Sequence, residues 1–111
     1  MSKTVNRVTI LGNILRAPTL NKTTSGATVC NAAIATNNRI TNKPQFTDIV
    51  LWNRAAEAFH KQVVEGTRVY IEGYINTYSN KDDNQKTEVV VSDFAVLDGG
   101  GVKPEEVILN D

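Results

Sequence analysis

The sequence has one cysteine, few aromatic residues and no long apolar run. Cys30 alone cannot form a disulfide within the chain. No apolar run approaches the roughly 20 residues that a membrane-spanning helix needs. The opening residues, MSKTVNRV, lack the apolar centre of a secretory signal. We therefore expect a soluble protein of a reducing, cytoplasmic compartment, with no membrane partner.

Net charge is also absent, because 12 Lys and Arg residues balance 12 Asp and Glu residues. The distribution is uneven, however. Up to residue 54, seven basic residues are opposed by Asp48 alone, so this stretch carries +6 and the remainder −6. Such asymmetry suggests a surface that faces a polyanion, although a fold can also bring the two halves together and cancel it.

A chain of 111 residues suits one domain, which would bury roughly 65% of the surface of its unfolded chain. We expect this domain to span residues 1–97. The remaining stretch, 98–111, begins with three glycines and ends EEVILND. Because glycines are entropically costly to order, it is predicted to be a short, flexible, acidic tail.

Alternating apolar residues predict five strands, at residues 5–15, 28–36, 46–52, 67–76 and 86–97. The stretch NKTTSG is read as a turn, and SNKDDNQ as a hairpin loop. After the third strand, Ala55, Ala56, Phe59 and Val63 recur at helical spacing, and Gly66 is expected to stop the helix. This order fits an all-β, five-stranded, partly open barrel of the OB-fold type, with one helix between strands three and four. Other small α+β sheets fit it as well.

Two rings mark the third strand. Phe46, Asp48, Val50 and Trp52 should share one face, since side chains alternate along a strand. The pattern by itself leaves two interpretations about equally open: rings packed in a core, or rings exposed as platforms for a ligand.

Three stretches carry a family resemblance: NRVTILGNI, VCNAAIATN and VLWNRAAEAFHKQVVEGTRVYIEGYI. Together with TEVVV in the last strand, they resemble the single-stranded DNA-binding proteins of the bacterial and mitochondrial type, over nearly all of residues 5–97. The resemblance implies an OB-fold, a homotetramer or at least a dimer, and sequence-tolerant binding of single-stranded DNA during replication, recombination and repair.

The resemblance also implies roles for the rings. Phe46 and Trp52 match positions where the family stacks bases. Two further family tryptophans are missing, because Ile40 and Asn80 occupy their places. Tyr78 is expected to serve as a substitute platform in the hairpin, and an ordinary exposed tyrosine is the alternative. With fewer rings, we expect weaker binding per nucleotide than in a typical member.

Four basic residues match places where the family carries positive charge: Arg7, Arg39, Lys43 and Arg54. They are expected to contact phosphates. Asp48 is a departure, because it lies on the ring-bearing face where relatives often have a basic residue.

An enzymatic function finds little support. GGGVK lacks the spacing of a phosphate-binding loop, and Glu57 with His60 makes half a metal site at most. Cys30 is interpreted as a small buried hydrophobe. We therefore expect no catalytic residue, metal or cofactor.

Tyr70 and Tyr74 lie on a face that a small barrel would gain by covering, so they are expected at an oligomer interface, in a tetramer first and a dimer otherwise. The short tail lacks the Pro-Phe end that recruits partners in the family, so recruitment of replication or recombination proteins is a weaker expectation. The shortness of the tail suggests a phage, mobile-element or specialised member of the family. An RNA-binding or protein-interaction barrel is the alternative function.

Overall fold

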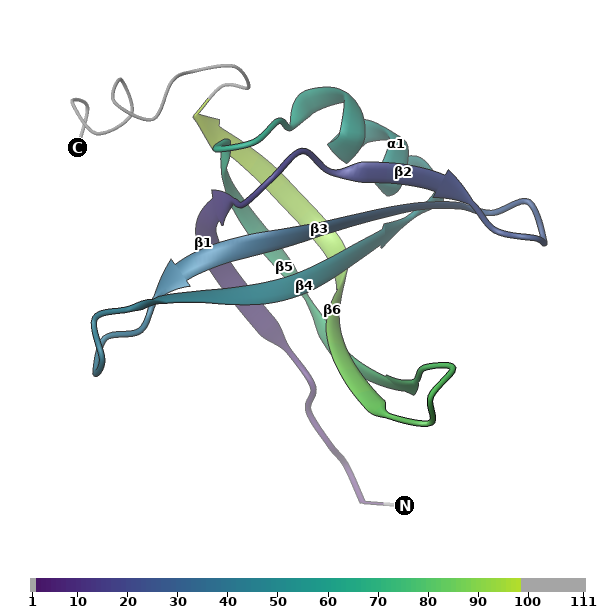
Figure 1. The fold of residues 1–111 in the computed structure, drawn as a ribbon, viewed down its shortest axis with the longest axis horizontal. Helices are drawn as coiled ribbons and strands as arrows, with labels where there is room; N and C mark the ends of the chain where they lie inside the picture. Colours follow the sequence, from purple (N-terminus) through teal and green to yellow (C-terminus); the bar gives the residue numbers. More distant parts are fainter. Residues whose placement is uncertain (1, 99–111) are drawn as a thin grey trace.

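The computed structural model describes residues 2–98. Six strands and one helix follow in the order β1 (Val8–Ile14), β2 (Thr19–Lys22), β3 (Thr28–Asn37), β4 (Pro44–Trp52), α1 (Asn53–Gln62), β5 (Arg68–Ser79) and β6 (Gln85–Asp98) (Figure 1). The expected tail lies outside the described residues, apart from Asp98, which ends β6.

Five of the strands close into a barrel. They are hydrogen-bonded in the order β1-β5-β6-β4-β3, and β3 pairs back onto β1 at Asn13–Ala35 and Ile14–Ile34. All pairs are antiparallel except β4 with β6, which are parallel at Ile49–Val89 and Val50–Val90. This is the OB-fold arrangement, so the predicted class, an all-β barrel of five strands with one helix, is confirmed.

Strand β2 was not predicted. It continues along the same edge of β3 that β1 leaves, and Asn21 and Lys22 pair with Val29 and Thr28. The turn read from NKTTSG is therefore shorter: it is closed by a hydrogen bond from the Thr23 N–H to the Ala27 carbonyl, with Gly26 at φ 92°. All four β2 residues are exposed, so no alternation of apolar residues signals the strand. Because of β2, the helix lies between the fourth and fifth strands.

The predicted role of Gly66 is wrong. Helix α1 ends at Gln62, and Val63 is already extended, at φ −117°. Gly66 does adopt a left-handed conformation, at φ 88°, but it does so in the following turn. There the Thr67 N–H donates to the Val64 carbonyl, and the Gly66 N–H donates to the Ile14 carbonyl. The glycine thus fastens the start of β5 to the end of β1.

The core fills the barrel from the inner faces of the strands. Fully buried side chains come from β3, β4 and β5, for example Ile34, Leu51 and Ile71, each 0% exposed. Helix α1 closes one end of the barrel with Phe59, whose ring meets that of Phe94 edge-on at a centroid distance of 5.1 Å. Such a T-shaped pair is a favourable aromatic geometry.

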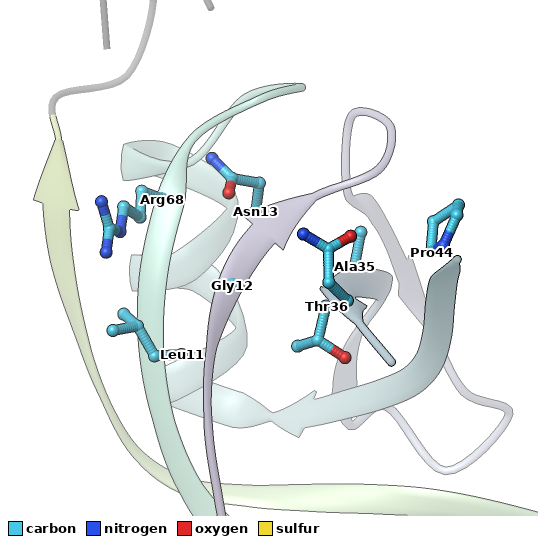
Figure 2. A pocket seen from close by; sticks show the side chains of 8 residues that line it. Leu11, Gly12, Asn13, Ala35, Thr36, Pro44 and Arg68 are labelled. Carbon is cyan, nitrogen blue, oxygen red and sulfur yellow. The ribbon is translucent and has the colours of Figure 1, made fainter. Parts of the chain in front are cut away.

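Gly12 allows the barrel to close. A Cβ at this position would collide with the carbonyl oxygen of Ala35, so any other residue would push β1 away from β3. Beyond this point the strands diverge around a hollow of about 500 Å³. Figure 2 shows Leu11 and Arg68 on one side of Gly12, and Ala35, Thr36 and Pro44 on the other.

Candidate nucleic-acid interface

Strand β4 presents two large rings on the outside of the barrel. Phe46 is 54% exposed and Trp52 is 41% exposed, whereas Ile49 and Leu51, which point the other way, are buried. Val50 shares the parity of the rings but is itself buried. The predicted alternation is therefore present, and the rings lie outside the core.

Small side chains surround these rings on β3. The register places Ala35 opposite Phe46, Ala33 opposite Asp48 and Val29 opposite Trp52. Directly opposed residues share a face of the sheet. Because alanine cannot reach over a neighbouring ring, Phe46 stays open to solvent.

Tyrosines continue the same face across the neighbouring strands. Tyr74 pairs with Val90 on β6, and Val90 pairs with Val50 on β4, so these three residues form one row across the sheet. Tyr78 lies four residues further along β5 and therefore has the same parity as Tyr74. Both rings are 45% exposed. We define the outer face by Phe46, Asp48, Val50 and Trp52 of β4, Val90 of β6, and Tyr74 and Tyr78 of β5. Sequence reasoning assigned Tyr74 to an oligomer interface and did not connect it with this face, because strand pairing is needed to see it.

Two basic residues lie in the loop between β3 and β4, which Asn38 organises. Its side-chain oxygen accepts hydrogen bonds from the Ile40 and Thr41 N–H groups, at 2.9 and 3.1 Å. Its side-chain nitrogen donates to Gln45 at 3.2 Å. The loop therefore holds Arg39 and Lys43 exposed at the Phe46 end of β4.

The hairpin between β5 and β6 is also organised by an asparagine side chain, but its charged residues are mostly acidic. The side-chain oxygen of Asn80 accepts from the Asp82 and Asn84 N–H groups, both at 3.0 Å. Lys81 is accompanied there by Asp82 and Asp83. Asn80 thus shapes the turn beyond Tyr78.

Arg54 lies at the other end of β4, in the first turn of α1. The chain passes directly from Trp52 into the helix because Asn53 adopts φ 54°, a conformation that asparagine tolerates. The helix has no side-chain cap and no acidic residue in its first turn. Trp52 is therefore next to the positive end of the helix dipole, and Arg54 adds an exposed positive charge in the same turn.

Arg7 precedes β1 and lines a separate hollow of about 420 Å³ together with Tyr74 and Glu72. The neighbouring Asn6 anchors this segment to β5: its side chain accepts from the Ile75 N–H at 2.9 Å and donates to the Ile75 carbonyl at 2.8 Å. The four predicted basic residues are thus exposed but spread around the barrel.

A smaller hollow, of about 220 Å³, lies beside Asp48, over β3 and towards the start of β2. Asp48 of β4 and Asn31 of β3 line it, together with Arg16 and Thr19. Sequence reasoning did not identify Arg16 or Asn31 as site residues. A polar asparagine within an otherwise small, apolar strand was the available signal.

Two titratable groups are shifted by their surroundings. The Tyr70 hydroxyl donates to Glu72 at 2.5 Å, and this hydrogen bond to a carboxylate raises the tyrosine pKa. Burial raises the pKa of the Cys30 thiol to about 11. The cysteine is 0% exposed in the core, which confirms its interpretation as a buried hydrophobe.

Within residues 2–98, no group of three or more His, Cys, Asp and Glu side chains is arranged to hold a metal ion. In the same range, no helix has the length and apolar character needed to cross a bilayer.

Comparison with known proteins gives a consistent set of relatives. The model of the Single-strand binding protein family matches residues 5–97. A single-stranded DNA-binding protein of Lactiplantibacillus plantarum is 36% identical over 103 residues, which cover 85% of this chain and 52% of the relative. Single-stranded DNA-binding protein 1 of Chlorobaculum tepidum is 30% identical over 116 residues, covering 91% and 72%.

A third relative, single-stranded DNA-binding protein 2 of Streptococcus agalactiae serotype V, is 29% identical over 101 residues, covering 84% of this chain and 77% of the relative. The chain spans about half the length of the Lactiplantibacillus protein. The family model nevertheless covers the whole barrel, from Val5 to Leu97, the last residue but one of β6. The chain therefore belongs to the Single-strand binding protein family.

Proposed function

We propose that this protein binds single-stranded DNA with little regard to sequence and protects it, as a binding protein rather than an enzyme. The observation that carries the proposal is the pair of rings, Phe46 and Trp52, exposed on one side of β4. Every base has a π-face, so stacking on an aromatic ring is tolerant of sequence and contributes about 1–3 kcal/mol per base. Tyr78 extends the platform, and Tyr74 adds a ring that the sequence had not assigned to it.

The positions of the basic residues support the same proposed function. Arg39 and Lys43 flank the Phe46 end of β4, and Arg54 flanks the Trp52 end. A strand laid along β4 would have basic groups for its phosphates at both ends, while its bases face the rings. Arg7, beside Tyr74, would extend the track around the barrel.

We further propose that the protein assembles as a homo-oligomer, as a tetramer or failing that a dimer. Only Asn13 and Ile14 of β1 pair with β3, so most of that edge of β1 bears no neighbouring strand. Unpaired edges favour association with another copy. Tyr70 and Leu11, adjacent on the outside of β1 and β5, add apolar surface there. Light scattering at micromolar concentration tests this, and a monomer mass alone would contradict it.

Membership of the family supports a role wherever single strands arise, in replication, recombination and repair in the cytoplasm. Recruitment of proteins of these processes is proposed for the acidic stretch after residue 98. Deleting residues 99–111 should then abolish partner binding while leaving the affinity for DNA intact.

The first test uses Trp52 as its own reporter, since it is the single tryptophan. A mixed-sequence DNA single strand should quench its fluorescence, and added salt should weaken the effect. An equal-length duplex should quench little. Quenching by neither would contradict the proposal, and stronger binding of the ribose strand would favour the RNA-binding alternative.

A further inference from the structure

The hollow beside Asp48, which Asn31 and Arg16 also line, differs chemically from the rest of the outer face. Along the strand, Asp48 lies two residues from Phe46, about 7 Å away at the usual rise. It is the carboxylate in the middle of a surface that we propose binds a polyanion. Its cross-strand neighbour, Ala33, is too small to cover it, so the carboxylate is exposed.

The polar side chains of this hollow have no protein partners. Within residues 2–98, the side chains of Asp48, Asn31 and Arg16 make no hydrogen bond or ion pair with another residue. Their hydrogen-bonding capacity is therefore available to a ligand. The volume, about 220 Å³, far exceeds that of a single water and suits one planar pyrimidine.

Electrostatics determines which part of a nucleotide can occupy this place. A phosphate would be repelled by Asp48, so the backbone must pass to one side and leave a base above the carboxylate. Arg16, which also lines the hollow, offers donors for a phosphate there. A base in the hollow would be the neighbour of one stacked on Phe46.

The same carboxylate distinguishes between bases. An ionised carboxylate only accepts hydrogen bonds. At C4 cytosine presents an amino group, which donates to a carboxylate, whereas thymine and uracil present an oxygen. Their N3–H can also donate, but it lies between the O4 and O2 oxygens, which repel a carboxylate placed there, so cytosine is the better partner. The Asn31 amide can both donate and accept, so it can satisfy the remaining edge of cytosine.

We propose that the Asp48–Asn31 hollow binds one base of the single strand and selects a base bearing an amino group, cytosine before thymine or uracil. This rests on the proposed function and refines it: the strand is bound whatever its sequence, with a preference at one position per barrel.

The test compares oligo-dC with oligo-dU of equal length, slightly above neutral pH, where cytosine is unprotonated. These strands differ only at C4 and in the hydrogen on N3, and both lack the thymine methyl group, which would add its own contacts. We expect the full-length protein to bind oligo-dC roughly fivefold more tightly, the lower end of discrimination by one carboxylate–base pair. In Asp48→Asn the ratio should fall to about one, while both affinities rise because a negative charge is lost. Asn31→Ala should reduce the ratio by less.

Glu65→Gln is the matched control. It removes the same charge from an exposed residue in the turn between α1 and β5, away from the outer face, so the ratio should stay as in the wild type. Equal binding of both strands by the wild type, or an unchanged ratio in Asp48→Asn, would overturn the inference and leave the proposed function standing. So would loss of the ratio in Glu65→Gln. Binding of neither strand would instead contradict the proposed function itself.

Discussion

The two faces of β4 belong to one short strand and have opposite surroundings. Ile49 and Leu51 point into the barrel and are 1% and 0% exposed, whereas Phe46 and Trp52 point outward and stay about half exposed. Full burial of such a ring would stabilise the fold by about 1.5–3 kcal/mol, and the outer rings forgo much of it. The inner residues thus contribute to folding, and the outer rings are available to a ligand.

The largest expected effect comes from a substitution on the inner face of β4. Leu51→Ala should lower the free energy of unfolding by about 2–5 kcal/mol, because it removes apolar contacts and leaves a cavity in the barrel. Denaturant unfolding measures the change. Leu20→Ala on β2, where the leucine is 38% exposed, is the control and should cost far less. Equal losses would contradict the distinction between the faces.

The complementary substitution removes an outer ring. Trp52→Ala should weaken binding of single-stranded DNA by about 1–3 kcal/mol, the contribution of one stacked base. Its effect on unfolding should be about 1–1.5 kcal/mol, roughly half that of a fully buried ring and well below that of Leu51→Ala, because Trp52 is 41% exposed. Fluorescence anisotropy of a labelled strand gives the affinity, and Trp52→Phe should retain most of it. A large loss of stability with unchanged affinity would assign the ring to the fold.

The loop at the Phe46 end of β4 provides a smaller effect. Arg39→Ala and Lys43→Ala should each reduce the slope of log affinity against log salt by about 0.7, if each side chain neutralises one phosphate. Titrations at several salt concentrations measure the slope. Lys81→Ala in the hairpin, where Asp82 and Asp83 are adjacent, should change it less. A slope that is unchanged in both loop variants would exclude phosphate contacts at this loop.

The smallest effect concerns the inner face again. Burial raises the pKa of the Cys30 thiol to about 11, while in the unfolded chain it titrates near about 8.5. The folded state therefore holds the proton more tightly, so this contribution is complete below about pH 8.5 and is lost as pH rises through about 11. The Tm should fall more steeply across this range in the wild type than in Cys30→Ala. Parallel pH profiles would contradict this.

Much of the fold could be predicted because local periodicity and global packing agree. The alternation in β4 correctly separated Phe46 and Trp52 from Ile49 and Leu51, and the helix followed where apolar residues changed to helical spacing. Strand β2 escaped prediction because its four exposed residues carry no pattern, and it forms only by pairing with β3. Gly66 was misread because a left-handed glycine serves a turn as well as a helix end.

The candidate site divides in the same way. Residues close in sequence, such as Phe46 and Trp52, could be placed on one face from the strand period alone. Tyr74 could not, because its row with Val90 and Val50 depends on pairing between β5, β6 and β4. The hollow of Asp48, Asn31 and Arg16 draws on three segments of the chain, so no local pattern contains it.

The amino-acid sequence by itself determined that the chain is mostly strands, that the helix follows β4 and that the two rings share one side of β4, since each follows from periodicity within one segment, while the class of barrel followed from the family resemblance. Only the tertiary structure decided how the barrel closes at Gly12, that Tyr74 joins the outer face, and that Asp48 faces an open hollow. The physical reason is that closure, register and cavities depend on contacts between strands distant in the chain, which no single segment specifies.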